Sequence, residues 1–255
     1  MRLLVAVLVA ACYPLVSVAL EEVRVLAVAT DVSSCERLAR ALEPYGIKIA
    51  VVEAKKGTLE ALAADGSDLR SQYDVVFLQP GRGLAERLGS FDAMLCDAMG
   101  EGLGLVVEGG PEGYADSGLH TAHLARWLPV VAVAPGPTGT RTSRNDRPTV
   151  QDERSGLLRY LGWGTAPAIA SYNLLETRRD AKVHLTADVF PLLVTWRLER
   201  ASVVAFAGGL TGPWAAKWSR WQSFDAFRAR LFRYAAGTDE QALKSIMPIR
   251  PSGAR

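Results

Sequence analysis

The sequence predicts a doubly wound α/β domain, with a flavodoxin-like, mostly parallel sheet, helices on both faces and an added β-hairpin region. Two observations predict this class. In the first half of the chain, short apolar runs alternate with segments of helical periodicity, as in βαβ units. In the second half, apolar runs follow one another with only turns between them, which is typical of hairpins.

The first half supplies four expected strands that are apolar almost throughout, as strands covered on both faces of a parallel sheet are. They are Val23–Ala29, Ile47–Val52, Asp74–Gln79 and Leu103–Val107. The helices expected between them are Ser34–Leu42, Leu59–Ala64 and Leu84–Met99. Asp31 or Ser33 is a suitable cap for the first helix. Right-handed crossovers then place helices on both faces of the sheet.

The second half is less regular. One helix is expected over His120–Trp127, and the stretch Gly136–Pro148, rich in Gly, Pro, Thr, Ser and Arg, is expected to be a long exposed loop. A closing helix is expected over Trp214–Ala235, with a tryptophan stripe that docks it on the sheet. The strands expected between loop and helix are Ala168–Tyr172, Ala181–Thr186, Phe190–Trp196 and Ser202–Ala207.

The amino-terminal segment, residues 1–20, is interpreted as a signal peptide or a membrane anchor. Arg2 precedes an apolar run that extends to Leu20 without a charge, and Ser17-Val18-Ala19 fits the small-x-small cleavage rule. A run of about 18 apolar residues is also just long enough to span a bilayer. A buried first strand or helix is the third alternative. The first two place the protein outside the cytoplasm, either membrane-anchored or secreted after cleavage.

The remaining chain divides into a domain over residues 21–236 and a polar tail over residues 237–255, expected to be flexible. Hydrophobic residues make up 49% of the 255 residues, enough for a substantial core, and the net charge of +2 gives no electrostatic reason to expect nucleic acid binding. Cys35 and Cys96 are interpreted as separate core thiols. No cysteine or histidine spacing predicts a metal site, and no cofactor is expected.

Several segments, taken in order, resemble a bacterial and archaeal family of class I glutamine amidotransferase-like domains that occurs in membrane-associated proteins. The stretch GLGLVVEGGPEGYADS at 102–117 matches the family's strand, its Gly-Gly turn and its Gly-Tyr-Ala-Asp segment. The later matches are LPV at 128–130, PLLVTWR at 191–197, VVAF at 203–206 and PWAAKWSRWQSF at 213–224. The family's glycine-containing final hairpin is replaced by Leu-Glu-Arg-Ala at 198–201.

The resemblance implies a nucleophile turn after the strand Leu103–Val107, but the residue there is Glu108, followed by Gly109 and Gly110. Class I enzymes use a cysteine on this turn, activated by a histidine that a carboxylate orients. No cysteine follows Cys96, and the only late histidine, His184, lacks the family's His-x-Glu pairing. Glutamine hydrolysis by the cysteine mechanism is therefore not expected.

The weak candidates for ligand binding are Glu108, Gly109, Gly110, Tyr114 and His120. A carboxylate at the carboxyl end of a parallel strand is well placed to meet a ligand, although Glu108 is equally suited to cap the next segment or to pair with an arginine. His120 and His123 lie one helical turn apart, which is common on surface helices and fixes no third metal ligand.

Two functions follow from these residues. The preferred hypothesis is a non-catalytic amidotransferase-like module, exported or membrane-tethered, that binds an unknown protein or small-molecule partner and no nucleic acid. Residues 1–20 would associate it with the membrane if they are not cleaved. The alternative is a hydrolase that uses a carboxylate or a metal near Glu108 and His120.

Overall fold

A computed structural model describes residues 21–65, 68–134, 139–143 and 145–249. The predicted leader, residues 1–20, lies outside this part of the chain. Within the described ranges, no helix is both long and apolar enough to cross a bilayer.

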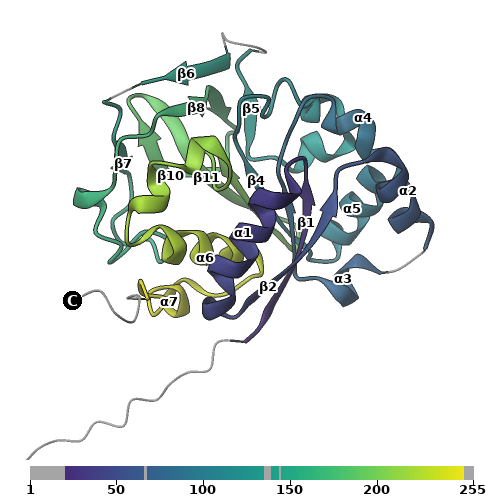
Figure 1. The fold of residues 1–255 in the computed structure, drawn as a ribbon, viewed down its shortest axis with the longest axis horizontal. Helices are drawn as coiled ribbons and strands as arrows, with labels where there is room; N and C mark the ends of the chain where they lie inside the picture. The colour runs from purple at the N-terminus through teal and green to yellow at the C-terminus, as the bar shows by residue number, and fades with distance from the viewer. Residues whose placement is uncertain (1–20, 66–67, 135–138, 144, 250–255) are drawn as a thin grey trace, which may run out of the picture.

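An eight-stranded sheet forms the centre of the molecule, in the order β2-β1-β3-β4-β12-β11-β10-β7 (Figure 1). The first five strands are parallel, and each remaining strand is antiparallel to its neighbour. The strands are β1 (Val23–Ala29), β2 (Ile47–Glu53), β3 (Val75–Leu78), β4 (Gly104–Glu108), β7 (Pro148–Val150), β10 (Lys182–Ala187), β11 (Phe190–Leu198) and β12 (Ala201–Phe206). The flavodoxin-like parallel sheet with an added hairpin region, predicted from the sequence, is confirmed.

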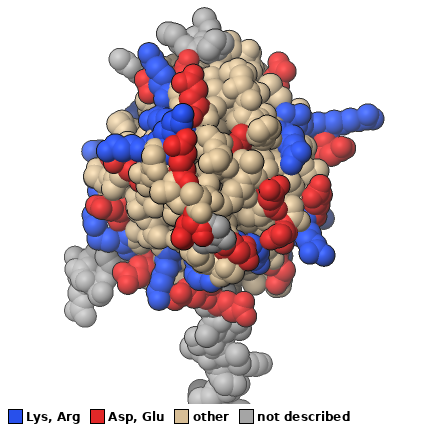
Figure 2. Space-filling view, turned by 90° about the vertical axis from the view of Figure 1, so that its right-hand side faces the viewer, with Lys and Arg blue, Asp and Glu red and all other residues tan. Residues whose placement is uncertain are grey.

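Helices cover both faces of the sheet, as expected. Figure 1 shows α1, α6 and α7 on one side and α2 to α5 on the other. The helices are α1 (Val32–Leu42), α2 (Lys56–Ala64), α3 (Leu69–Gln72), α4 (Leu84–Leu88), α5 (Ser90–Gly100), α6 (Phe224–Ala235) and α7 (Glu240–Leu243). The carboxylate of Asp31 accepts a hydrogen bond from the Ser34 amide, which makes it the N-cap of α1. Over α2 to α5, basic and acidic side chains are interspersed on the surface (Figure 2).

The long connection from β4 to β12 carries two small antiparallel pairs beside the antiparallel half of the main sheet. They are β5 (Val130–Ala132) with β9 (Leu175–Thr177), and β6 (Thr140–Thr142) with β8 (Ser171–Asn173). The prediction of a long loop over Gly136–Pro148 is therefore wrong in part, because β6 and the first residue of β7 lie within this stretch. Residues 136–138 and 144 of that stretch lie outside the described ranges.

Three expected helices are interrupted, each by a local feature. Gly89 adopts φ 51° and ψ −127°, a backbone open essentially to glycine, and separates α4 from α5. His120–Trp127 is not one helix but two 3₁₀ segments, Leu119–Thr121 and His123–Trp127, joined by the extended residue Ala122.

The closing helix begins only at Phe224. The preceding residues form two 3₁₀ turns, Pro213–Ala215 and Trp218–Arg220, and end at Trp221, which is extended. Trp218 and Trp221 are nevertheless buried, against Trp163 and Phe227. Trp218 and Trp221 thus dock on the core as expected, but from 3₁₀ turns rather than from one helical face, whereas Trp214 of the expected stripe is only half-buried.

The stretch expected as a tail, as far as residue 249, packs on the domain. Leu243 of α7 and Ile246 are buried. The guanidinium of Arg230, fully buried in α6, donates to the carbonyl of Ile246 from Nε and Nη2 at 3.1 and 2.8 Å, and from Nη1 to the carbonyl of Gly156 at 3.0 Å. Hydrogen bonds to a charged donor are among the stronger ones, so this side chain fastens the segment to α6.

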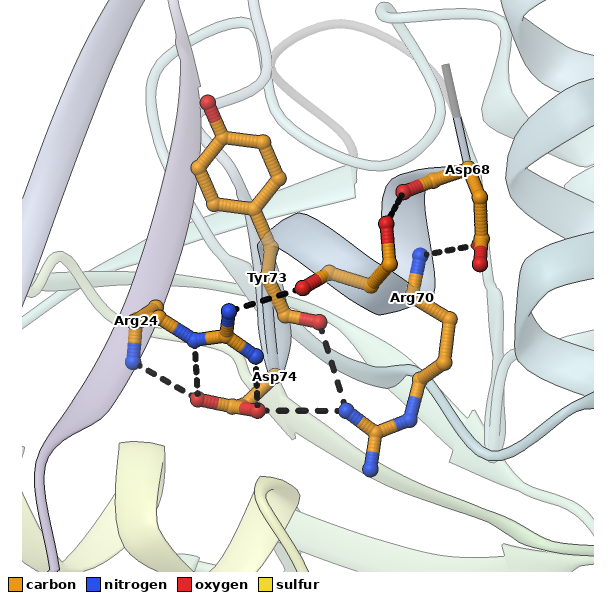
Figure 3. Close-up of polar contacts among 6 residues, drawn as sticks. Arg24, Asp68, Arg70, Tyr73 and Asp74 are labelled. Carbon is orange, nitrogen blue, oxygen red and sulfur yellow. Dashed lines mark hydrogen bonds and ion pairs between the residues drawn. The ribbon is translucent and has the colours of Figure 1, made fainter.

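The amino edge of the parallel sheet is held by a charged network around Asp74 (Figure 3). Its carboxylate accepts hydrogen bonds from the Arg24 amide at 2.9 Å, from the Arg24 guanidinium at 3.0 and 3.3 Å, and from Arg70 Nη1 at 3.1 Å. Burial raises the pKa of Asp74, but the bonds from Arg24 and Arg70 outweigh it and leave that pKa below its ordinary value. The network joins the starts of β1 and β3, at the opposite edge from the site described next.

Candidate functional site

A cavity of about 130 Å³ opens at the carboxyl edge of the parallel sheet, where β1, β3 and β4 end. Ligands in open α/β sheets bind at this edge, beside the point where the strand order reverses. Here the order reverses at β1, which has β2 on one side and β3 on the other. The cavity is lined by Thr30, Asp31, Gln79, Pro80, Glu108, Gly109, Gly110, Pro111, Thr211, Gly212, Pro213 and Trp214.

Glu108 is the last residue of β4 and lines this cavity, which is called here the cavity above Glu108. Its side chain is 2% exposed and turns inward to the segment that follows β12. Oε2 accepts hydrogen bonds from the backbone amides of Leu210 at 2.5 Å and Thr211 at 2.8 Å, and Oε1 accepts one from the Thr211 hydroxyl. The carboxyl group therefore fixes the loop that forms one wall of the cavity.

Gln79 connects Glu108 to the start of α1. Its Nε2 donates to Thr211 Oγ1 at 2.6 Å and to Ser34 Oγ at 2.8 Å, and its Oε1 accepts from the Asp31 amide at 2.6 Å. Thr211 therefore lies between the carboxamide and the carboxyl group. The loops after β1, β3, β4 and β12 form one hydrogen-bonded unit around the cavity.

The environment of Glu108 shifts the pKa of its carboxyl group into the neutral range. Burial raises the pKa of its carboxyl group to about 7, and the hydrogen bonds from Thr211 and Leu210 limit that rise. Near neutral pH the group can therefore gain or lose a proton, as a general acid or base does. Its inward orientation and its bonds to the loop leave little of it open to a ligand.

Gly109 and Gly110 differ sharply in the space around them. A Cβ on Gly109 would lie 2.0 Å from the carbonyl oxygen of Ala207 and 2.6 Å from Asn173 Oδ1, so only glycine fits. A Cβ on Gly110 would meet no atom within 4 Å. The amide of Gly110 donates to Asn173 Oδ1 at 3.0 Å, which holds the turn while leaving the space above it open.

Tyr114 lies behind the Glu108 turn. It is buried, and its hydroxyl group donates to the carbonyl of Val107 at 3.1 Å. Burial, with the negative charge of Glu108 nearby, raises its pKa well above the ordinary value. Its backbone has φ 35°, an unfavourable value for a residue other than glycine. Such strain persists only where the surrounding structure enforces it, and it often occurs at functional sites.

His120 does not join Glu108. Its side chain is exposed and lines a different cavity of about 80 Å³, shared with Tyr114, Leu119 and Arg178. Tyr114 lines this second cavity but not the cavity above Glu108. Across the described ranges, no group of three or more His, Cys, Asp and Glu side chains is arranged to hold a metal ion.

The two described cysteines are free and buried, as the sequence suggested, and neither lines the cavity above Glu108. Burial raises the pKa of the Cys35 thiol far above its ordinary value, and the charge of Glu108 adds to that rise. Burial also raises the pKa of Cys96 to about 11. Both side chains are therefore thiols rather than nucleophilic thiolates near neutral pH.

His184, the only late histidine, is enclosed in the antiparallel half. It is fully buried on β10, with Nδ1 3.1 Å from Ser155 Oγ and Nε2 2.8 Å from Thr195 Oγ1. Burial lowers its pKa to about 4. Strands β11 and β12 separate β10 from β4, so this imidazole cannot serve as a base for a group at Glu108.

Gln79 and Thr211 are cavity residues that no sequence motif indicates, and Trp214 is a cavity residue that the sequence pattern places on a docking face. Gln79 had a usable signal, because it ends an expected parallel strand just as Glu108 does. Thr211 follows the β12 strand within the glycine-rich run 208–212, which the sequence pattern did not connect to Glu108. The spacing of the tryptophans predicts a helix face for Trp214, whereas the 3₁₀ turn that contains it places it at the cavity.

No protein-family model matches the sequence, and no curated protein matches it. Solved structures do match. Cytoplasmic Protein STM3548 from Salmonella typhimurium superimposes with a TM-score of 0.69 at 16% identity, over 84% of this chain and 98% of that one. Cytoplasmic Protein STM1381 from Salmonella typhimurium LT2 gives 0.65 at 17% identity, over 83% and 99% of the two chains.

A putative thua-like protein from Parabacteroides merdae has a TM-score of 0.55 at 14% identity, over 85% of this chain and 90% of that one. At these identities the likeness establishes a shared fold. The match covers nearly the whole length of each of the three proteins.

Proposed function

We propose that this chain is a non-catalytic, glutamine amidotransferase-like module, exported or tethered to a membrane, that binds a small polar ligand in the cavity above Glu108. One observation carries the proposal. The position that the resemblance assigns to the nucleophile holds Glu108, whose carboxyl group is turned inward and bonded to Leu210 and Thr211. At the end of β4, this side chain organises the cavity wall.

The lining of the cavity supports a polar ligand without a negative charge. Hydroxyl groups come from Thr30 and Thr211, a carboxamide from Gln79 and a carboxylate from Asp31, while Trp214 offers an aromatic face. No lysine or arginine is among the lining residues. Hydrogen-bond acceptors around a small volume favour a ligand that donates hydrogen bonds, such as a hydroxylated or amine-bearing molecule.

An assay of glutamine hydrolysis tests the non-catalytic part of this proposal. The full chain and its Glu108→Ala variant are incubated with glutamine, and released ammonia is measured. We expect no turnover by either protein above the rate without protein. Turnover by the wild-type chain that disappears in Glu108→Ala would overturn the proposal, provided that circular dichroism shows the variant to be folded.

A hydrolase that uses Glu108 as a general base is the second candidate, and the pKa of about 7 favours it. The 2% exposure of the side chain opposes it, because a base must reach the proton that it removes. Metal analysis of the purified chain separates the two functions further. A tightly bound metal in a one-to-one ratio would favour the hydrolase, and a metal-free chain that still binds a ligand would favour the module.

A further inference from the structure

One side of the domain exposes apolar side chains around the last described residues. Among the large apolar side chains that are well exposed in the described ranges, Tyr160 is 59% exposed, Met247 48% and Ile249 50%. Ile249 lines a groove of about 810 Å³, and Tyr160 and Met247 line a neighbouring groove of about 370 Å³. Gln222 lines both grooves, so they adjoin. Exposed apolar patches of this kind often mark interaction sites.

The backbone of Tyr160 adds to this observation. Its φ is 65°, in the left-handed region that residues other than glycine seldom adopt. The fold therefore holds an aromatic ring outward in a strained conformation, with the Arg159 guanidinium 4.7 Å from the ring centre. Strained residues with exposed side chains are candidates for function rather than for packing.

The chain enters the domain beside these grooves. The Arg233 guanidinium donates to the carbonyl of Glu21 at 2.8 Å and to the carbonyl of Tyr45 at 2.6 Å. Tyr45 also lines the larger groove, and its hydroxyl group accepts a hydrogen bond from the Ile249 amide at 3.2 Å. The apolar segment of residues 1–20 is thus attached next to the exposed Ile249.

The charged side chains that line the larger groove suit an anionic surface. Arg40 and Arg220 line it and are exposed, while the lining carboxylate, Asp225, is paired with Arg228. Trp221 and Tyr45 form buried aromatic parts of the same lining. Arginines beside exposed apolar and aromatic side chains are the composition that proteins present to the headgroup region of a bilayer.

We propose that this surface, made by Arg40, Tyr160, Arg220, Met247 and Ile249 and called here the exit surface, lies against the phospholipid bilayer that holds residues 1–20. The inference rests on the tethering that the proposed function includes, and it is independent of what the cavity binds. The length and position of the leader favour a lipid surface over a second protein, because the leader joins the domain at Glu21, which Arg233 links to Tyr45 and so to the side of the domain that carries Ile249.

The proposal fixes the orientation of the domain relative to the bilayer. Residues 1–20 join β1 at its amino end, whereas the cavity above Glu108 lies at the carboxyl ends of β1, β3 and β4. Figure 1 shows the amino ends of β1 and β2 on the same lower side as α7. Seven strand residues at about 3.3 Å each separate the two edges by about 23 Å. The cavity therefore lies at the opposite edge of the sheet from the junction with residues 1–20.

Fluorescence quenching in vesicles tests this orientation. The full chain carries Cys12→Ser, and a polarity-sensitive dye is attached to a single introduced cysteine, either Ile249→Cys on the exit surface or Val189→Cys. Val189 is the matched control, because it is an apolar residue, 78% exposed, in the turn between β10 and β11 near the carboxyl edge. The vesicles contain phosphatidylcholine, phosphatidylglycerol and a nitroxide-labelled lipid that quenches dyes at the bilayer surface.

We expect the dye at residue 249 to be quenched several times more strongly than the dye at residue 189. Equal quenching at both positions in vesicle-bound protein would overturn the proposal. Failure of the full chain to float with the vesicles would overturn the tether and the exit surface together. Ligand binding in the cavity is measured without vesicles, so that part of the proposed function would be judged separately.

Discussion

Glu108 and His184 are buried titratable side chains in the two halves of one sheet, and their surroundings differ. Glu108 ends a parallel strand, and its partner Thr211 and its neighbour Gln79 both line a cavity. His184 lies in the antiparallel half, where its partner Ser155 is fully buried, as is its other partner Thr195. Burial shifts both pKa values strongly, to about 7 for Glu108 and to about 4 for His184.

The comparison shows that a perturbed pKa does not by itself identify a functional site. Structural groups enclosed in a core are perturbed as strongly as groups that meet a ligand. The distinguishing feature is the connection to a cavity, which Glu108 has through Thr211 and His184 lacks. The following predictions test this difference, beginning with the largest expected effect.

Gly109→Ala should distort the turn after β4, which places Glu108 beside the cavity in the parallel half of the sheet. The added Cβ would lie 2.0 Å from the Ala207 carbonyl oxygen, so β4 or β12 has to move. We expect a loss of more than about 3 kcal/mol in the free energy of unfolding. Urea denaturation measures this loss. Unchanged stability would mean that β4 and β12 are not as close as described.

Glu108 should make the protein less stable as the pH rises. The folded pKa of about 7 lies above the ordinary value of 4.5, so the folded protein binds the extra proton between these pH values. The stabilisation is complete below about pH 4.5 and is lost as the pH rises through 7, by about 3 kcal/mol in all. Glu108→Gln removes this loss, so urea denaturation should find the variant more stable than wild type at pH 8 and similar to it at pH 5.

His184 should have the opposite dependence, over nearly the same range. Its folded pKa of about 4 lies below the ordinary value of 6.5, so the unfolded chain binds the extra proton. This contribution is present above about pH 6.5 and is lost as the pH falls toward 4, again by about 3 kcal/mol. In His184→Gln, stability measured by urea should decrease as the pH rises from 5 through 7, where Glu108 loses its proton, and then level off. A rise with pH in that variant would contradict the assignment.

The wild-type protein should therefore show little change in stability from pH 5 to pH 6.5, because the two contributions oppose each other. The variant Glu108→Gln with His184→Gln should show a similarly flat profile, since it lacks both groups. The two single variants should show slopes of stability against pH that have opposite signs. Urea titration at several pH values measures these slopes. Parallel slopes in the two single variants would show that other groups dominate the pH dependence.

The parallel half could be predicted from the sequence because each of its strands is a local apolar run. The expected strands Val23–Ala29 and Leu103–Val107 lie within a residue of β1 and β4. The last strand was also found, but its place beside β4 depends on pairing between segments about a hundred residues apart, such as Val107 with Ala205. The sequence alone does not specify that pairing.

Of the five residues that the sequence predicts for ligand binding, only the three on the turn after β4 line the cavity. Glu108, Gly109 and Gly110 line the cavity, whereas Tyr114 supports them from behind and His120 belongs to another cavity. The sequence predicts one helix over His120–Trp127. Asp92 instead accepts hydrogen bonds from the amides of His123 and Leu124, and the extended Ala122 turns the chain there. Such contacts from distant parts of the chain override local propensity.

The most direct test of the binding site compares Gly110→Val with Gly164→Val. Neither glycine has an atom within 4 Å of an added Cβ, and neither has a positive φ, so both variants should fold. Only Gly110 lines the cavity above Glu108. A panel of small hydroxylated and amine-bearing molecules is screened by NMR for binders of the wild-type chain, and their affinity for each variant is measured. The proposed function predicts that Gly110→Val abolishes binding and Gly164→Val preserves it. Equal binding by both variants would place the ligand elsewhere and contradict the assignment of the site.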